Sequence, residues 1–125
     1  MTDQNLAMAS PDAVTIYNLC RRIDWEAAQR LGRYEGSAND RSDGFIHFST
    51  GAQVIESARK HYAGIAGLLL LAVNSARLGS ALKWEPSRGG QLFPHLYEHL
   101  PIDAVTSIRE LPLGPDGLHL FPDLS

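Results

Sequence analysis

Cysteine is almost absent from this 125-residue sequence, in which Cys20 is the single example. One cysteine excludes an internal disulfide and any zinc site built from several cysteines, as is usual for chains kept in a reducing cytosol. The first dozen residues also lack the basic start and apolar core of a secretory signal. We therefore expect a cytoplasmic protein in which Cys20 is a small residue at the end of a strand.

Long hydrophobic runs and an excess of positive charge are missing as well. A membrane-spanning helix needs roughly 20 apolar residues, whereas the longest run here, GLLLLAV at 67–73, suits a central strand buried on both faces. The net charge is -3, with 11 Lys and Arg against 14 Asp and Glu. We expect no membrane association, and a nucleic-acid partner would need a local basic patch.

The length fits one domain with a single core, and no repeat or linker divides it. We expect a flexible tail at 1–13 and one domain at 14–125. Two helices are predicted early, at 23–32 with Asp24 as the N-cap and at 51–64 with Thr50 as the cap. The predicted strands cover 14–19, 45–49, 67–73, 82–85, 95–100, 104–113 and 118–121. This pattern predicts an α+β fold with a largely antiparallel sheet or a split pair of sheets.

His47 lies inside the predicted strand FIHFS. Period-two alternation places Ile46 and Phe48 against the core, so His47 shares the mixed face with Ser49 and lines a cleft or a thinner layer. The alternative is an ordinary core histidine bonded to a backbone carbonyl. The helix N-terminus predicted at 51–53 favours an anion, so His47 with the neighbouring hydroxyls predicts a phosphate-binding corner.

The segment KWEPSRGGQLFPHLY, residues 83–97, collects aromatic side chains, a carboxylate, a guanidinium and two glycines. Such a loop has three features of a small-molecule pocket: an aromatic surface for stacking, a fixed charge and a backbone that a ligand can approach closely. The alternative is a surface ion pair between Glu85 and Arg88 on a glycine-rich turn, with Trp84 and Phe93 in the core.

Several common reaction centres are not indicated. His95 and His99 are four residues apart in a segment that we expect to be extended, which separates them by about 13 Å. One metal ion with ligand bonds of about 2 Å cannot bind both, and we predict no metal site. No Gly-x-Ser-x-Gly motif is present, and SRGG does not have the spacing of a P-loop.

Long segments resemble a known family. DWEAAQRLGRYEGSANDRSDGFIHFSTGAQV, KWEPSRGGQLFPHLYEHLP and LPLGPDGLHLFP are similar to the bacterial and plant family called domain of unknown function 952, over about residues 14–122. That family is in turn similar in fold to the ADP-ribosyltransferase superfamily, which includes the RNA 2′-phosphotransferases. The resemblance therefore implies an ADP-ribosyltransferase-like fold with largely antiparallel split sheets.

The superfamily resemblance also implies positions for its signature residues. GFIHFST before a helix ending in ARKHY is similar to the strand that carries the nicotinamide-stacking tyrosine, and His47 stands at that position. Asn18, in YNL, takes the place of the first-strand histidine. Leu96 lies nearest the position of the late acidic residue, so Glu85 or Glu98 would have to stabilise a ribosyl transition state.

These features together predict a cleft that binds a nucleotide-like or phosphorylated ligand, with NAD as the implied cofactor of an NAD-dependent or phosphate-ester transferase. His47, Glu85 and His95 are the catalytic candidates, with His47 as acid or base. The ligand-binding candidates are Tyr17, Asn18, Arg41, Ser49, Thr50, Trp84, Arg88 and Tyr97. Two alternatives stay open: a non-catalytic binding or regulatory module, and an RNA-end-processing enzyme whose arginines at 21, 22, 30, 33 and 41 gather on one face.

Overall fold

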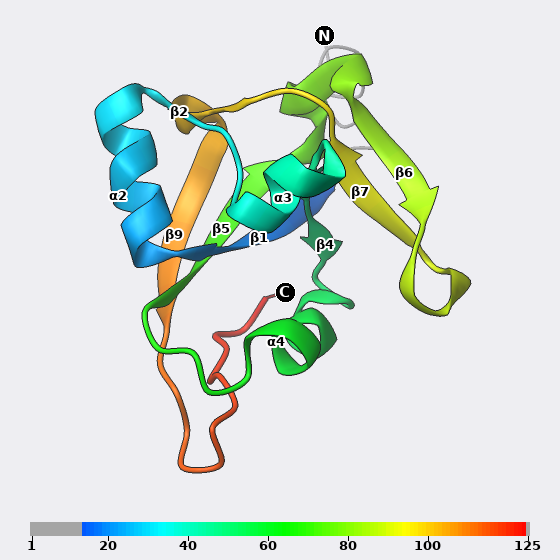
Figure 1. Ribbon diagram of the computed structural model, residues 1–125. Coiled ribbons are helices and arrows are strands. Elements are labelled where there is room, and N and C mark those ends of the chain that lie inside the picture. The colour runs from blue at the N-terminus through cyan, green and yellow to red at the C-terminus, as the bar shows by residue number, and fades with distance from the viewer. Residues whose placement is uncertain (1–13, 125) are drawn as a thin grey trace, which may run out of the picture.

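The computed structural model describes residues 14–124, and the tail predicted at 1–13 lies outside them. A four-stranded antiparallel sheet forms the centre, with the strand order β4-β1-β5-β9 (Figure 1). The run LLLLAV makes β5 a strand buried on both faces, as predicted, and β5 pairs with β1. The strands are β1 (Thr15–Arg21), β4 (Ser49–Thr50), β5 (Leu68–Asn74) and β9 (Val105–Leu111).

Two smaller antiparallel sheets complete the β structure. One has the order β3-β7-β6, formed by β3 (Ile46–His47), β6 (Leu82–Pro86) and β7 (Leu92–Leu96). The other pairs β2 (Arg33–Tyr34) with β8 (Leu100–Pro101). The prediction of an α+β fold with antiparallel, split sheets is confirmed at this level.

Three α-helices are present among the described residues: α2 (Arg22–Leu31), α3 (Ala38–Asp43) and α4 (Val54–Tyr62). Short 3-10 helices lie at Ser75–Ala81, Arg88–Gly90 and Ile102–Ala104. The predicted helix at 23–32 is confirmed and ends at Gly32, which has the left-handed φ of 93° that a glycine C-cap allows. It begins one residue earlier than expected, so Asp24 lies in its first turn and is not the N-cap.

The predicted start of the second helix is wrong. The segment 51–53 forms a turn and α4 begins at Val54, with Gln53 as the N-cap residue. The Gln53 side-chain carbonyl accepts a hydrogen bond from the Thr50 backbone N–H at 3.0 Å, and the Gln53 N–H returns one to Thr50 O. These bonds close a turn over residues 50–53, so the first helical turn of α4 begins after Gln53 and not at residue 51.

Three predicted strands also differ from the observed ones. The segment FIHFS divides into β3 and β4 at Phe48, because each half pairs with a different sheet. The strand expected at 95–100 instead covers 92–96 and then turns, so Pro94 lies inside a strand. The strand expected at 118–121 is reduced to one bridge between Leu113 and His119.

The core lies on both faces of the central sheet. One cluster includes Ile16, Leu71 and Trp25 of α2, and the other joins Leu70 to Val54 of α4. Cys20 belongs to the first cluster at the end of β1, and burial raises the pKa of its thiol to about 12. None of the helices within residues 14–124 is long and apolar enough to cross a membrane.

Candidate functional site

A break between two sheets creates the cleft. Residues 46–50 cross from the β3-β7-β6 sheet to β1, which pairs with β4 only through Ile16 and Tyr17. Beyond Tyr17, β1 has no neighbouring strand on this side among the described strands. The Asn18 side chain bridges the gap by donating from Nδ2 to His47 O at 2.8 Å. A cleft of about 750 Å³ opens along this free edge of β1.

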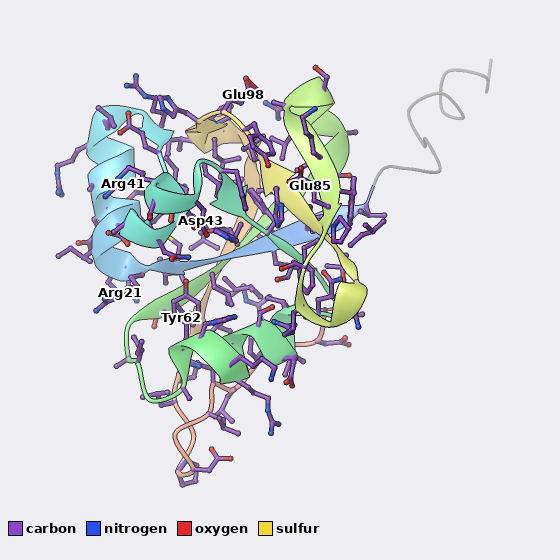
Figure 2. All side chains as sticks on the ribbon, turned by 45° about the vertical axis from the view of Figure 1, so that its right-hand side comes forward. Arg21, Arg41, Asp43, Tyr62, Glu85 and Glu98 are labelled. Carbon is purple, nitrogen blue, oxygen red and sulfur yellow. The ribbon has the colours of Figure 1, made fainter. Side chains whose placement is uncertain are left out.

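Two helices border the cleft. Figures 1 and 2 show α3 and α4 on opposite sides of β1, and Figure 2 shows Arg41 and Asp43 on α3, with Tyr62 on the α4 side near Arg21. Arg88 of the 88–90 turn and Phe93 and His95 of β7 also line the cleft. The polar and aromatic residues that line the cleft are Tyr17, Asn18, Arg21, Asp24, Tyr34, Ser37, Asn39, Asp40, Arg41, Asp43, His47, Phe48, Ser49, Ser57, His61, Tyr62, Ser87, Arg88, Phe93 and His95.

His47 is held between two carboxylates of α3. Its Nδ1 lies 2.6 Å from Asp40 Oδ1, and its Nε2 lies 3.0 Å from Asp43 Oδ2. The hydrogen bond to Asp40 raises the pKa of His47 above its usual 6.5; burial opposes this, and the charges of both carboxylates add to it. Two acceptors on the two ring nitrogens favour the imidazolium form, which donates from both.

The position of Asp40 follows from local sequence. Ser37 and Asp40 form a capping box: Ser37 Oγ accepts from the Asp40 backbone N–H at 3.1 Å, and Asp40 Oδ2 accepts from the Ser37 N–H at 2.9 Å. Gly36, with φ 95°, allows the chain to turn closely against the Asp40 side chain. The segment GSAND therefore starts a helix whose first-turn carboxylate reaches His47.

His95 lies opposite His47 in the register of β3 and β7. Its Nδ1 lies 2.7 Å from Glu85 Oε1, the oxygen that also accepts from the Tyr97 hydroxyl at 2.7 Å. The hydrogen bonds from Tyr97 and His95 lower the pKa of Glu85, and Glu85 raises the pKa of Tyr97. The Phe45 ring stacks on His95 with centroids 4.0 Å apart.

Three arginines line the cleft without an ion pair to any described residue: Arg21, Arg41 and Arg88. Arg41 donates to Gly36 O at 2.6 Å. Arg88 lies over the Phe93 ring, 5.0 Å from its centroid, and both of its terminal nitrogens are 3.4 Å from Ser57 Oγ. The surface pair between Arg88 and Glu85, considered as an alternative, does not form, because Glu85 faces His95 and Tyr97.

Seven of the candidates from sequence lie along the cleft: Tyr17, Asn18, Arg41, His47, Ser49, Arg88 and His95. Thr50, Trp84, Glu85 and Tyr97 do not line it. Trp84 pairs with Pro94 on the face of the β6-β7 hairpin opposite to Glu85 and His95, and it is 39% exposed. Leu96, nearest the expected acidic position, is fully buried, and Figure 2 shows Glu98 on the other side of α3 from Tyr62.

The sequence predicted no helix or strand in the segment 33–44, and only Arg41 was named from it as a site residue. This segment supplies Tyr34, Asp40 and Asp43 to the cleft. The capping-box spacing of Ser37 and Asp40 was the available signal for α3. Arg21 and Tyr62 were also missed as lining residues, and no local pattern marks them, because the sheet and α4 bring them together from distant parts of the chain.

One buried acceptor at the cleft has no partner within residues 14–124. Asn18 is 3% exposed, and its Oδ1 has no hydrogen bond among the described residues, while its Nδ2 is bonded to His47 O. Within residues 14–124, no group of three or more His, Cys, Asp or Glu residues could hold a metal ion.

Comparison with known proteins assigns the chain to a family. The family model described as Protein of unknown function (DUF952) matches residues 19–108. The chain belongs to the DUF952 family. No curated protein matches this DUF952 chain at a significant level.

Solved structures of another protein share this fold. The crystal structure of protein CC0527 from Caulobacter crescentus is 50% identical, with a TM-score of 0.84, and the match covers 86% of this chain and 94% of that one. The solution NMR structure of CC0527 is 51% identical, with a TM-score of 0.75 over 83% of this chain and 90% of that one. A crystal structure of a CC0527 double mutant is 48% identical, with a TM-score of 0.84 and the same coverage as the first.

Proposed function

We propose that the cleft binds a phosphorylated, nucleotide-like ligand. The observation that carries the proposal is the set of three cleft arginines, Arg21, Arg41 and Arg88, that have no carboxylate partner within residues 14–124. Most other arginines are paired: Arg22 with Glu110, Arg33 with Glu35, Arg59 with Glu56 and Arg77 with Asp103. A guanidinium presents parallel N–H donors that match a phosphate bidentately, so arginines left without a carboxylate in one cleft favour a phosphate group.

The carboxylates of the cleft do not cancel this preference. Asp40 and Asp43 already accept hydrogen bonds from His47, whose raised pKa favours the positive form. Asp24 is the remaining acidic lining residue, against three arginines. The local balance is therefore positive in a chain whose net charge is -3, which concentrates an anionic ligand at this one place.

The other lining groups suit a nucleoside. Tyr17, Tyr62 and Phe93 offer aromatic surface, and the hydroxyls of Ser49 and Ser57 can bond to ribose oxygens. The unpaired Oδ1 of Asn18 is an acceptor that a ribose hydroxyl or an amide N–H would satisfy after a small movement. A volume of about 750 Å³ lies in the range of small-molecule sites, about 300–1,000 Å³.

NAD-dependent transfer on an ADP-ribosyltransferase-like fold is the second candidate. The bond between Asn18 and His47, at 2.8 Å, supports it, because it joins the two positions that the superfamily resemblance aligns with the first-strand histidine and the stacking tyrosine. Neither Glu85 nor Glu98, the two acidic residues considered for stabilising an oxocarbenium-like transition state, lines the cleft. We therefore rank ligand binding, with or without phosphate-ester chemistry, above NAD cleavage.

An RNA-end-processing role requires the early arginines on one face. Of the five considered, Arg21 and Arg41 line the cleft, whereas Arg22 and Arg33 are paired with glutamates elsewhere. Arg30 also lies outside the cleft lining, so only two of the five arginines reach the cleft, which suits one or two nucleotides better than a long RNA strand.

Thermal-shift measurements test the proposal, using ADP, ADP-ribose, NAD and a 2′-phosphorylated oligonucleotide. A ligand that binds only the native state adds about 2.7 kcal/mol to the free energy of unfolding when its free concentration is 100 times Kd, and Tm rises as a result. We expect Arg88→Met or Arg41→Met to reduce the shift. Arg109→Met is the matched control, because Arg109 is exposed on β9 outside the cleft. If no compound shifts Tm, or if Arg109→Met acts like Arg88→Met, the proposal is wrong.

A further inference from the structure

Two histidines face each other across adjacent strands in the cleft. His47 of β3 and His95 of β7 are directly opposite in register, and both line the cleft. Their ring centroids are 5.6 Å apart, with the rings at 68° to each other. The Phe45 ring contacts both, with centroids 4.6 Å from His47 and 4.0 Å from His95. The two imidazoles are therefore held close together in fixed orientations.

Each histidine is oriented by a carboxylate at Nδ1. Asp40 Oδ1 lies 2.6 Å from His47 Nδ1, and Glu85 Oε1 lies 2.7 Å from His95 Nδ1. The pKa of Glu85 is lowered, so its ionised carboxylate accepts a hydrogen bond from the Nδ1–H of His95. Carboxylate contacts of this kind fix the tautomer and leave Nε2 as the reacting nitrogen.

The two Nε2 atoms differ in what they offer. His95 Nε2 has no hydrogen-bond partner among the described residues, and in the neutral tautomer it carries a lone pair. His47 Nε2 faces the exposed Asp43 carboxylate at 3.0 Å and bears a proton in the imidazolium form. One histidine is thus suited to accept a proton and the other to donate one, which is the requirement for coupled general base and general acid catalysis.

We propose that His95 and His47 act as the base and the acid of a phosphoryl transfer on a nucleoside phosphodiester bound in the cleft. This inference rests on the proposed function, because the cleft arginines hold the phosphate. His95 Nε2 takes the proton of an attacking hydroxyl, whose oxygen forms a bond to phosphorus. The opposite phosphorus–oxygen ester bond breaks, and the leaving oxygen takes the proton from His47 Nε2.

The step requires the Asp43 carboxylate to move away from His47 Nε2, so that the leaving oxygen can contact this nitrogen. Its side chain is 45% exposed on the last turn of the short α3, so it can rotate towards solvent. After the step His47 is neutral and His95 is charged, and proton exchange with water restores both. The attacking hydroxyl can come from two sources: water, with a nucleoside 2′,3′-cyclic phosphate as substrate, or the neighbouring ribose 2′-hydroxyl of a dinucleotide.

Turnover of both substrates, followed by 31P NMR, tests the proposal. We expect one of them to be cleaved with a bell-shaped dependence of kcat/KM on pH, and His95→Gln to lower kcat by at least about 100-fold. His99→Gln is the matched control, because His99 is exposed and outside the cleft. Glu85→Gln tests the positioning role: kcat should fall while KM is retained, since Glu85 acts only through His95.

Calorimetric binding of a nucleoside 3′-monophosphate distinguishes failure of the acid–base pair from failure of the binding cleft. If the monophosphate binds but neither diester is cleaved, the acid–base pair is refuted while the binding cleft stands. If cleavage occurs but His95→Gln and His99→Gln behave alike, the assignment of His95 is wrong. Absence of binding to the native protein refutes both proposals. Circular dichroism of each variant verifies that it is folded.

Discussion

Replacement of Asp40 by alanine should destabilise the protein through α3. Asp40 is 5% exposed, and its carboxylate accepts three hydrogen bonds: from the Ser37 N–H at 2.9 Å, from His47 Nδ1 at 2.6 Å and from the His47 backbone N–H at 3.3 Å. The first belongs to the capping box, and the other two tie α3 to β3. Asp40→Ala removes all three at once.

The expected loss can be worked out from these contacts. Loss of a helix cap costs about 1 kcal/mol. A hydrogen bond to a charged group contributes about 1.5–3 kcal/mol, which we reduce to about 1–2 kcal/mol because the His47 side chain is 39% exposed. The free energy of unfolding should therefore fall by about 2–3 kcal/mol. At about 3–5 °C for each kcal/mol in a domain of this size, Tm should fall by about 6–15 °C.

Urea denaturation and calorimetry at pH 6 measure this change. Asp43→Ala is the matched control: it removes the other carboxylate of His47, but Asp43 is 45% exposed and accepts only from His47 Nε2 at 3.0 Å. We expect Asp43→Ala to cost less than about 1 kcal/mol. Equal losses in the two variants would contradict the reasoning, because they would mean that the buried cap and the bonds of Asp40 do not hold α3.

Three further predictions follow from single features. Because the pKa of His47 is raised in the folded state, its contribution to stability is complete below pH 6.5 and is lost as the pH rises through the raised pKa. An NMR titration should give a His47 pKa above 6.5, and this pKa should fall in Asp40→Asn. A His47 pKa at or below 6.5 in the native protein would contradict this prediction. Leu71→Ala should lower the free energy of unfolding by about 2–5 kcal/mol, because Leu71 is fully buried in β5, whereas the exposed Leu120→Ala should cost less than about 1 kcal/mol; similar values would contradict the described core. Gly36→Ala should lower Tm more than Gly32→Ala, although the two glycines have similar φ angles of 95° and 93°. The reason is that a Cβ at Gly36 would lie 2.7 Å from Asp40 Cβ, whereas a Cβ at Gly32 would meet no atom within 4 Å. Equal losses of Tm would exclude the close contact.

The sequence predicted those parts of the fold that follow from local patterns. The apolar run of β5, the strand predicted at 14–19 and the helix predicted at 23–32 depend on short-range signals, and all three elements are present. Alternation also placed Ile46 and Phe48 in the core, where they are 3% and 2% exposed. Such patterns succeed because each residue's environment repeats with the period of its own strand or helix.

The division of the segment 45–50 between two sheets was not predictable in this way. Its strand-like pattern runs through Phe48 without interruption, and only pairing with β7 on one side and β1 on the other separates β3 from β4. The same tertiary pairing opens the cleft and brings Arg21, Tyr62 and Arg88 to it from distant positions. The site therefore depends on long-range contacts that local propensity does not encode.

The side of the β6-β7 hairpin that each residue occupies was also undetermined from sequence. The aromatic and charged residues of 83–97 were grouped as one pocket, but the strands alternate them between two faces. Phe93 and His95 face the cleft, whereas Trp84 lies on the other face. The register of β6 and β7 pairs Trp84 with Pro94, and only this pairing shows that Trp84 lies on the face away from the cleft.

The central claim is that a phosphorylated nucleotide binds at the free edge of β1 between α3 and α4. The most direct test is a titration of the 15N-labelled protein with ADP, followed by amide chemical shifts. We predict that the largest changes fall in residues 17–21, 37–47, 57–62 and 87–95, which line or support the cleft, and that they weaken in Arg88→Met. Changes centred on β9, or none at millimolar ADP, would contradict the account.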